Sequence, residues 1–166
     1  MPANVHYLNC AYMSPLSHVV AQALTDGALR KQAPWTYRPA DFFDVSERFR
    51  SRAAQLAGVA ADTIAIVPSA SYGLAIAARN LPLARGQRIV LLADQFPSNV
   101  YPWRDLAQKC GAVIDTVQRD AEAAWTGAVL DAIGPDTGIV AVPHCHWADG
   151  RLVDLVAVGR RCREYG

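Results

Sequence analysis

Two hydroxyl side chains and a very small residue stand where an apolar stretch meets a helical pattern. In the segment IAIVPSASYGLAIAAR, residues 64–79, these are Ser69, Ala70 and Ser71. A helix begins with unbonded N–H groups and a partial positive charge; small side chains let an anion approach them, and hydroxyls add donors. The segment therefore predicts a phosphate-binding turn, although a plain serine N-cap explains the same residues. The chain has no Walker pattern and no GxGxxG pattern, so ATP and dinucleotides have no specific support.

A second group of polar and aromatic residues follows the apolar run at 88–94. The segment QFPSNVYPW contains Phe96, Ser98 and Asn99. The flat ring of Phe96 could stack on a planar ligand, with Ser98 and Asn99 supplying polar contacts. A core position for Phe96 and a helix cap at Ser98 are the plainer alternatives.

A third group, HCHWADG, follows the apolar run that begins at residue 137. If the strand continued to residue 147, His144 and His146 would share one face and Cys145 would lie on the other. Two ligands do not complete a zinc site, and no partner pair has a suitable spacing, so we expect no metal. Polar contacts to a ligand, or hydrogen-bonded imidazoles that are partly buried, explain these histidines better.

The elements that must position these groups alternate along the chain. Because the expected strands are apolar runs, they suit a parallel sheet that is covered on both faces. The sequence thus predicts an α/β fold, a three-layer α/β/α sandwich with a mostly parallel sheet, in which ligands gather at the carboxyl ends of the strands. The expected strands are 63–67, 88–94, 112–118 and 137–147, and the expected helices are 71–81, 98–111, 121–133 and 152–166.

The first 60 residues have a different pattern. Residues 5–9 predict a short strand or extended arm, and Ser14 with Pro15 predicts the start of a helix that runs to about residue 31. A second helix follows, with Asp41 as its cap and Gly58 as its stop. We expect residues 1–166 to form a single, incomplete cofactor-binding large domain, with the arm and two helices in 1–60 and the alternating elements in 61–166.

Composition excludes several classes of protein. Sixteen basic and 15 acidic residues give a formal charge of +1, which offers no electrostatic reason for a nucleic-acid or anionic-membrane partner. The four cysteines form no CxxC pair, so we expect them to be reduced and mostly buried. The chain starts without a signal-peptide pattern and has no apolar stretch of about 18 residues. We therefore expect a soluble, cytoplasmic protein.

Four stretches together resemble the group V aminotransferase family, the fold-type I pyridoxal-phosphate enzymes that include cysteine desulfurases, kynureninases and isopenicillin-epimerase-like proteins. They are YLNCAYMSPLSHVV, IAIVPSASYGLAIAA, VLLADQFPSNVYPW and IVAVPHCHWADGRLVDL, in family order and over nearly the whole chain. The resemblance implies the amino-terminal part of the large domain of the PLP-transferase fold. It also implies an enzyme that acts on a small amino acid substrate with pyridoxal 5'-phosphate as cofactor.

The resemblance assigns most of the cofactor contacts to the groups described above. Ser69, Ala70 and Ser71 match the turn that holds the cofactor phosphate through backbone N–H groups and hydroxyls. Phe96 matches the residue that stacks on the pyridine ring; kynureninases use Phe there, whereas desulfurases use His. Asn99 matches a polar residue beside the cofactor.

Other positions depart from the family pattern or lie at its margins. Trp147 stands where desulfurases carry an Asn that contacts the phenolic oxygen of the cofactor, and an indole N–H could replace that donor. Asn9 and Ala11 resemble the segment that lines the substrate entrance. Lys31 and Lys109 are expected on helices away from the strand ends, so this chain offers no lysine for the Schiff base and no catalytic residue.

The resemblance leaves the reaction open among transamination, desulfuration, β-γ cleavage and epimerisation, with Phe96 arguing against a cysteine desulfurase. It implies a homodimer for the full-length protein, and we expect residues 1–166 alone to be inactive. Two alternatives use the same residues. One is a stand-alone α/β module that binds a phosphorylated small molecule, and the other is a truncated remnant.

Overall fold

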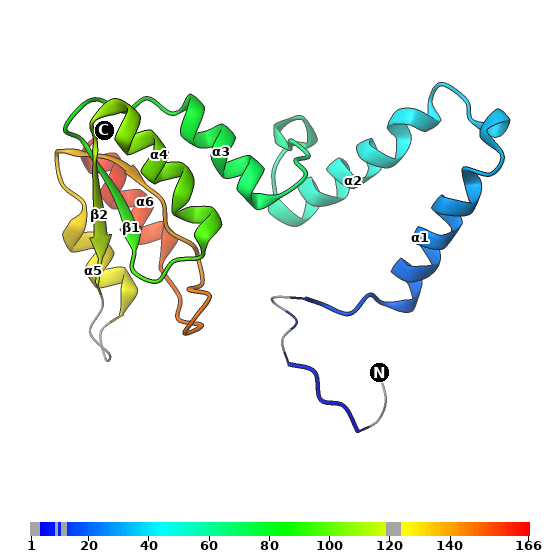
Figure 1. Cartoon of the computed structure of the whole chain (residues 1–166), viewed down its shortest axis with the longest axis horizontal. Helices are drawn as coiled ribbons and strands as arrows, with labels where there is room; N and C mark the ends of the chain where they lie inside the picture. Colours follow the sequence, from blue (N-terminus) through cyan, green and yellow to red (C-terminus); the bar gives the residue numbers. More distant parts are fainter. Residues whose placement is uncertain (1–3, 9, 11–12, 119–123) are drawn as a thin grey trace. The chain divides into compact units, whose positions relative to one another are not determined.

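The computed structural model describes residues 4–8, 10, 13–118 and 124–166 (Figure 1). The chain divides into two compact units, Met1–Ile66 and Val67–Gly166. Each unit is described by itself below. The expectation of one incomplete large domain stays a prediction.

The first unit consists of helices with little core of their own. Its elements are α1 (His18–Arg30), the 3-10 helix η1 (Pro34–Thr36), α2 (Asp41–Ala57) and the 3-10 helix η2 (Ala61–Thr63). Ala54 is the buried apolar residue of α2, whereas Phe42, Phe49 and other large apolar side chains of both long helices are exposed. Residues 5–8 form no strand, so the strand alternative for 5–9 is wrong for these residues, the alternative of an extended arm stays a prediction, and residue 9 lies outside the described residues.

The ends of these helices differ partly from the expected caps. Ser17, not Ser14, caps α1, because its backbone is extended and its hydroxyl accepts a hydrogen bond from the N–H of Val20 at 3.3 Å. Asp41 is the first residue of α2 rather than its cap, and its carboxylate pairs with Arg30 and Arg38. Gly58 ends α2 in the left-handed conformation, with φ of 67°, as predicted.

The second unit is built on a parallel sheet. Its strands are β1 (Arg88–Leu92), β2 (Val113–Val117) and β3 (Thr137–Val140), in the order β2-β1-β3. Both pairings are parallel; Val90 lies opposite Asp115 on one side and Val140 on the other. Because parallel neighbours need a crossover, each connection carries a helix.

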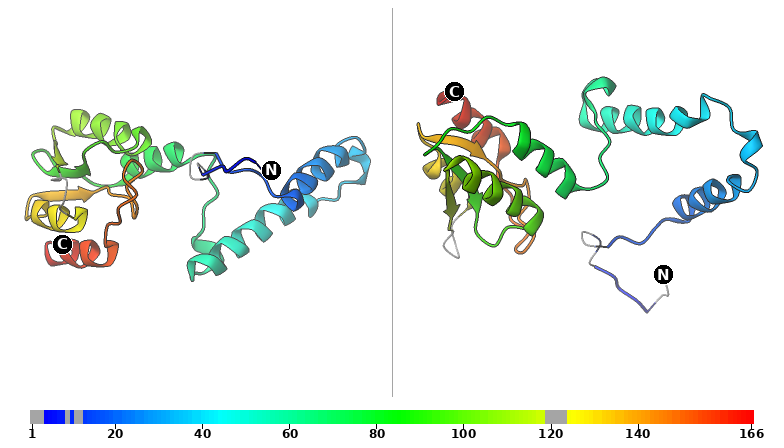
Figure 2. Two further views of the ribbon diagram at one scale, coloured as in Figure 1. Left: turned by 90° about the horizontal axis from the view of Figure 1, so that it is seen from below. Right: turned by 45° about the horizontal axis from the view of Figure 1, so that its top comes forward.

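Helices cover both faces of this sheet (Figures 1 and 2). They are α3 (Ala70–Asn80), α4 (Tyr101–Cys110), α5 (Trp125–Ala132) and α6 (Leu155–Glu164), with the 3-10 helix η3 (Pro97–Asn99) before α4. The core under α3 and α4 comprises Ala78, Ile89, Leu91, Trp103, Ala107, Ile139 and Ala141. The core under α5 and α6 comprises Val90, Leu92, Val117, Trp125, Val129, Ile133, Val153 and Val158. Alternate residues of β1 thus enter opposite cores, which confirms the three-layer α/β/α fold.

Two expected strands are wrong in whole or in part. Residues 64–67 form no strand, because an extended segment needs a neighbour for its backbone hydrogen bonds and the described sheet pairs only β1, β2 and β3. The strand expected at 137–147 ends at Val140. The cysteines are free thiols, but none is buried: Cys10 and Cys145 are exposed and the other two are intermediate. No helix in the described part of the chain is both long and apolar enough to cross a lipid bilayer.

Candidate functional site

The N-terminus of α3 uses its first serine as a cap. Ser69 is the N-cap in an extended conformation, and its Oγ accepts a hydrogen bond from the N–H of Tyr72 at 3.1 Å. The plainer interpretation of Ser69 is therefore the one that the geometry favours. Because the first N–H groups of a helix have no partner within it, those of Ala70 and Ser71 remain at this end as donors. Both residues are exposed.

The second serine links this helix to the loop after β1. The Oγ of Ser71 donates a hydrogen bond to the Oγ of Ser98 in η3 at 2.9 Å. The expectation of a helix cap at Ser98 is wrong, since Val100 is the N-cap of α4 and has no side-chain hydrogen bond to it. This contact brings the turn at 69–71 beside the segment that carries Phe96.

Phe96 and Trp147 form an aromatic pair at the carboxyl end of the sheet. Their ring centroids are 5.4 Å apart and their planes are nearly perpendicular, at 89°. Phe96 is 43% exposed and Trp147 is 60% exposed, so neither belongs to the core. The indole Nε1–H of Trp147 donates to the carbonyl oxygen of Asp94 at 2.6 Å. That N–H is thus already engaged, and another acceptor such as a phenolic oxygen would have to displace the carbonyl oxygen of Asp94 from it.

Asn99 has both ends of its amide engaged within the protein. Its Nδ2 donates to the carbonyl oxygen of Ala141 at 3.0 Å, and its Oδ1 accepts from the Nε1–H of Trp103 at 2.9 Å. Trp103 and Ala141 are both buried. The side chain therefore joins α4 to the residue that follows β3.

A buried cluster surrounds His146, in line with the expectation of a hydrogen-bonded imidazole at this position. His146 is only 3% exposed, its Nε2 lies 3.1 Å from the carbonyl oxygen of Ala93, and its ring stacks on Trp125 at 4.8 Å. Its Nδ1 lies 3.4 Å from Oδ1 of Asp149, whose other oxygen accepts from the Nε1–H of Trp125. Sequence reasoning missed its partners Trp125 and Asp149, because nothing in the sequence around His146 indicates them.

The expected alternation across the histidines is wrong. His144 and Cys145 are exposed while His146 is buried, because β3 ends at Val140, the backbone bends at His144 and a turn follows at 147–149. Cys145 instead forms an isolated antiparallel bridge with Leu152. Within the described residues, no three His, Cys, Asp or Glu side chains are grouped so as to hold a metal ion.

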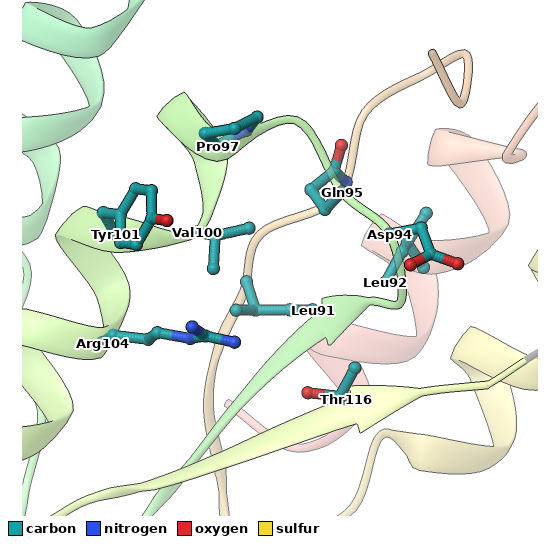
Figure 3. Close-up of a pocket in the computed structure, with 9 residues that line it drawn as sticks. All are labelled: Leu91, Leu92, Asp94, Gln95, Pro97, Val100, Tyr101, Arg104 and Thr116. Carbon is teal, nitrogen blue, oxygen red and sulfur yellow. The ribbon is translucent and has the colours of Figure 1, made fainter. Parts of the chain in front are cut away.

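A cavity of about 250 Å³ lies at the loop that follows β1, between the end of β1, the start of α4 and Thr116 of β2 (Figure 3). Figure 3 shows Arg104 extending from α4 toward the sheet. The lining residues are Leu91, Leu92, Asp94, Gln95, Pro97, Val100, Tyr101, Arg104 and Thr116. None of the residues expected to bind a ligand lines this cavity. Asn9 and Ala11, expected at the substrate entrance, lie outside the described residues.

Comparison with known proteins places this arrangement in a family. The sequence profile described as "Aminotransferase class-V" matches residues 34–166. The chain belongs to the class-V aminotransferase family. Enzymes of this family use pyridoxal phosphate.

Two curated relatives support the assignment. The chain is 27% identical over 162 residues to "Uncharacterized aminotransferase YcbU" of Bacillus subtilis (strain 168), covering 94% of this chain and 40% of that protein. It is 25% identical over 76 residues to "Probable cysteine desulfurase" of Mycoplasma genitalium, covering 46% of this chain and 19% of that protein. The chain thus spans well under half the length of the curated relatives that it matches.

Solved structures of similar proteins share the fold. The cystine C–S lyase C-DES, solved with its reaction product cysteine persulfide, matches with a TM-score of 0.86 at 22% identity over 99% of this chain and 45% of that one. A mutant of C-DES carries glycine covalently linked to its PLP cofactor and matches with a TM-score of 0.85 at 22% identity, over 99% of this chain and 44% of that one. The apo cysteine desulfurase of Thermococcus onnurineus NA1 matches with a TM-score of 0.67 at 24% identity, over 79% of this chain and 34% of that one.

Proposed function

We propose that this chain is the amino-terminal part of a longer pyridoxal-phosphate-dependent enzyme that acts on an amino acid. In this proposal the start of α3 holds the cofactor phosphate and Phe96 stacks on the cofactor ring. The observation that carries it is the hydrogen bond between Ser71 and Ser98, because it joins a phosphate-type turn to the loop of an exposed ring. Family membership and the C-DES neighbours support the choice of cofactor.

The donor set of the described residues fits this cofactor. Two N–H groups at the start of an 11-residue helix suit a phosphate dianion, which the helix dipole also favours. The paired hydroxyls of Ser71 and Ser98 share one proton between them and keep the other for the ligand, with Ser98 as donor within the pair when Ser71 donates to the phosphate. The half-exposed ring of Phe96 suits a planar heterocycle. When bound, the cofactor would supply an electron sink for negative charge at the substrate α-carbon.

Each residue has a distinct part in this proposal. Ala70 and Ser71 bind the phosphate and thereby fix one end of the cofactor. Phe96 covers one face of the ring and excludes water from it, while Trp147 supports Phe96 from the side. Ser69 and Asn99 act on the protein, as a helix cap and as a link between α4 and the end of β3.

The lysine that binds the cofactor covalently is, in this proposal, outside residues 1–166. Lys109 lies on α4 and pairs with Asp105 at 2.6 Å, and Lys31 is the C-cap of α1. We therefore expect residues 1–166 alone to bind the cofactor without a covalent bond and to be inactive. Borohydride reduction followed by peptide mapping checks this, and a stable adduct on either lysine would contradict it. We further propose that the full-length protein is a homodimer.

Two serine variants test the phosphate assignment. Ser71→Ala should weaken binding of pyridoxal phosphate, measured by equilibrium dialysis, while binding of pyridoxal, which lacks the phosphate, stays unchanged. Ser69→Ala is the matched control: it removes a cap and should lower stability by about 1 kcal/mol with less effect on phosphate recognition.

A third variant tests the ring. Phe96→Ala should weaken binding of pyridoxal phosphate and of pyridoxal alike, because both share the stacked ring. This placement of the cofactor would be wrong if Ser71→Ala weakened binding of both ligands equally. It would also be wrong if Phe96→Ala weakened binding of neither ligand. Binding of many phosphorylated compounds with equal affinity would favour a general phosphate-binding module instead.

A further inference from the structure

The turn that follows β1 contains a strained residue. Asp94 has φ of 50° and is the non-glycine residue with positive φ among those described. An L-residue in the left-handed region is disfavoured, and such a conformation persists where the surroundings hold it. Asp94 lies two residues before Phe96, so its conformation sets the direction in which the chain presents that ring.

Two consecutive side chains hold two consecutive carbonyl groups of this turn. The ring Nε2 of His146 is 3.1 Å from the carbonyl oxygen of Ala93, and the Nε1–H of Trp147 donates to that of Asp94 at 2.6 Å. With Nε2 protonated, both side chains act as donors to carbonyl groups of this turn. We name residues 146 and 147, together with these two contacts, the His-Trp clasp.

The clasp is anchored in the protein interior on the side of His146. The imidazole stacks on Trp125, which is 4% exposed and belongs to the core under α5. The loop around it is closed by backbone bonds from His146 N–H to the oxygen of Arg151 at 2.9 Å and from Gly150 N–H to the oxygen of His146 at 2.8 Å. Because these contacts fix the ring of His146, they also restrict the position of the next residue, Trp147.

We infer that His146 and Trp147 are positioning residues that hold the Asp94 turn in its left-handed form and so fix Phe96 for ring stacking. The inference rests on the proposed function for the role of Phe96. In this inference Trp147 is not a donor to the phenolic oxygen of the cofactor. Its N–H donates to the carbonyl oxygen of Asp94, and its ring packs against that of Phe96 in a perpendicular arrangement with the centroids 5.4 Å apart.

The clasp itself is tested without any ligand, in the purified protein labelled with 15N-tryptophan. Trp147→Phe assigns the indole N–H signal of Trp147. Although its ring is 60% exposed, this N–H should exchange with solvent at least tenfold more slowly than that of Trp35, whose ring is 81% exposed. Exchange as fast as in Trp35 would show that the bond to Asp94 is absent and would overturn the inference.

Substitution at His146 tests the coupling between the two side chains. His146→Phe keeps a ring against Trp125 but removes the donor to Ala93, and it should speed exchange of the Trp147 N–H. His146→Gln retains a donor at similar reach and should restore part of the slow exchange. His144→Phe is the matched control, because His144 is exposed, and it should change nothing. Equal effects of the substitutions at 144 and 146 would refute a specific role for His146.

The effect on the ring site is tested with three probes: pyridoxal phosphate, pyridoxal and inorganic phosphate. Trp147→Phe removes one hydrogen bond while keeping an aromatic ring, so it should weaken binding of pyridoxal phosphate and of pyridoxal about fivefold to tenfold. Affinity for inorganic phosphate should stay within twofold, because α3 supplies that contact. A loss shared by all three probes would indicate general disruption and would overturn the positioning role.

The outcomes separate the two proposals. If the unsubstituted protein failed to bind pyridoxal phosphate and pyridoxal, the proposed function would fail while slow exchange of the Trp147 N–H could still establish the clasp. If the unsubstituted protein bound both ligands but Trp147→Phe left their affinities unchanged, the clasp would not position Phe96.

Discussion

Replacing Asn99 by Ala should destabilise the second unit strongly, because this side chain satisfies two buried groups at once. The variant leaves the Nε1–H of Trp103, a residue only 3% exposed, without its acceptor at 2.9 Å. It also leaves the carbonyl of Ala141, 8% exposed, without its donor at 3.0 Å. A buried polar group that loses its partner costs about 1–3 kcal/mol.

The two losses together should lower the free energy of unfolding by about 2–4 kcal/mol, with water that enters the space left by the side chain keeping the cost toward the lower end. With a urea m-value of about 2 kcal/mol/M, the unfolding midpoint should fall by about 1–2 M. Asn80→Ala is the matched control. The amide of Asn80 bonds to the carbonyl oxygen of Ile76 on the exposed surface of α3, so its loss should change stability by less than about 0.5 kcal/mol.

Urea unfolding followed by tryptophan fluorescence and by circular dichroism measures both variants. The resemblance to the family places Asn99 beside the cofactor, and that assignment gives the opposite expectation. If Asn99→Ala left the unfolding midpoint within 0.3 M of the unsubstituted protein, a figure of about 0.6 kcal/mol on the same m-value, the structural role would be refuted. If the same variant selectively lost affinity for the cofactor, that result would instead support the assignment of Asn99 beside the cofactor.

Further predictions concern pH and backbone conformation. The hydrogen bonds from Arg88 lower the pKa of Asp136, so this carboxylate stabilises the fold above its unfolded pKa, and its contribution is lost as pH falls through the lower, folded value. Urea midpoints between pH 5 and pH 2 should therefore fall less steeply in Asp136→Asn. Gly150 has φ of 70° in the loop that contains the clasp, so Gly150→Ala should lower stability by about 1 kcal/mol in thermal unfolding. Gly127→Ala, within α5 and with open space around the added Cβ, should instead raise stability by about 0.5–1 kcal/mol; a loss at both positions would contradict the argument from φ.

The layered fold could be predicted because its signal is local. The apolar runs at 88–92 and 113–117 are strands, and each alternates with an amphipathic helix, so a parallel sheet between two helical layers followed directly. The prediction failed at 64–67, where an equally apolar run forms no strand. Apolar composition indicates burial, but a strand also requires a neighbour for its hydrogen bonds, and the sequence of one segment does not contain that neighbour.

The meeting of these residues at one end of the sheet was predictable, whereas most of their contacts were not. Ser71, Phe96 and Trp147 follow elements whose order brings them to one end of the sheet, and the structure places Ser71 beside Ser98 and Phe96 beside Trp147. The contact of Asn99 with Ala141 joins residues 42 positions apart, and no spacing rule predicts it.

The sequence by itself determined the fold class, the family and the segments that lie at the carboxyl ends of the strands, because periodicity and short motifs encode these features. The tertiary structure alone decided what each side chain does there. The hydroxyl of Ser71 bonds to that of Ser98, the ring of His146 is buried against Trp125, and the N–H of Trp147 donates to the carbonyl oxygen of Asp94. The reason is physical: a donor bonds to whichever acceptor the packed chain brings within about 3 Å, and that partner is set by packing across the molecule rather than by the neighbouring sequence.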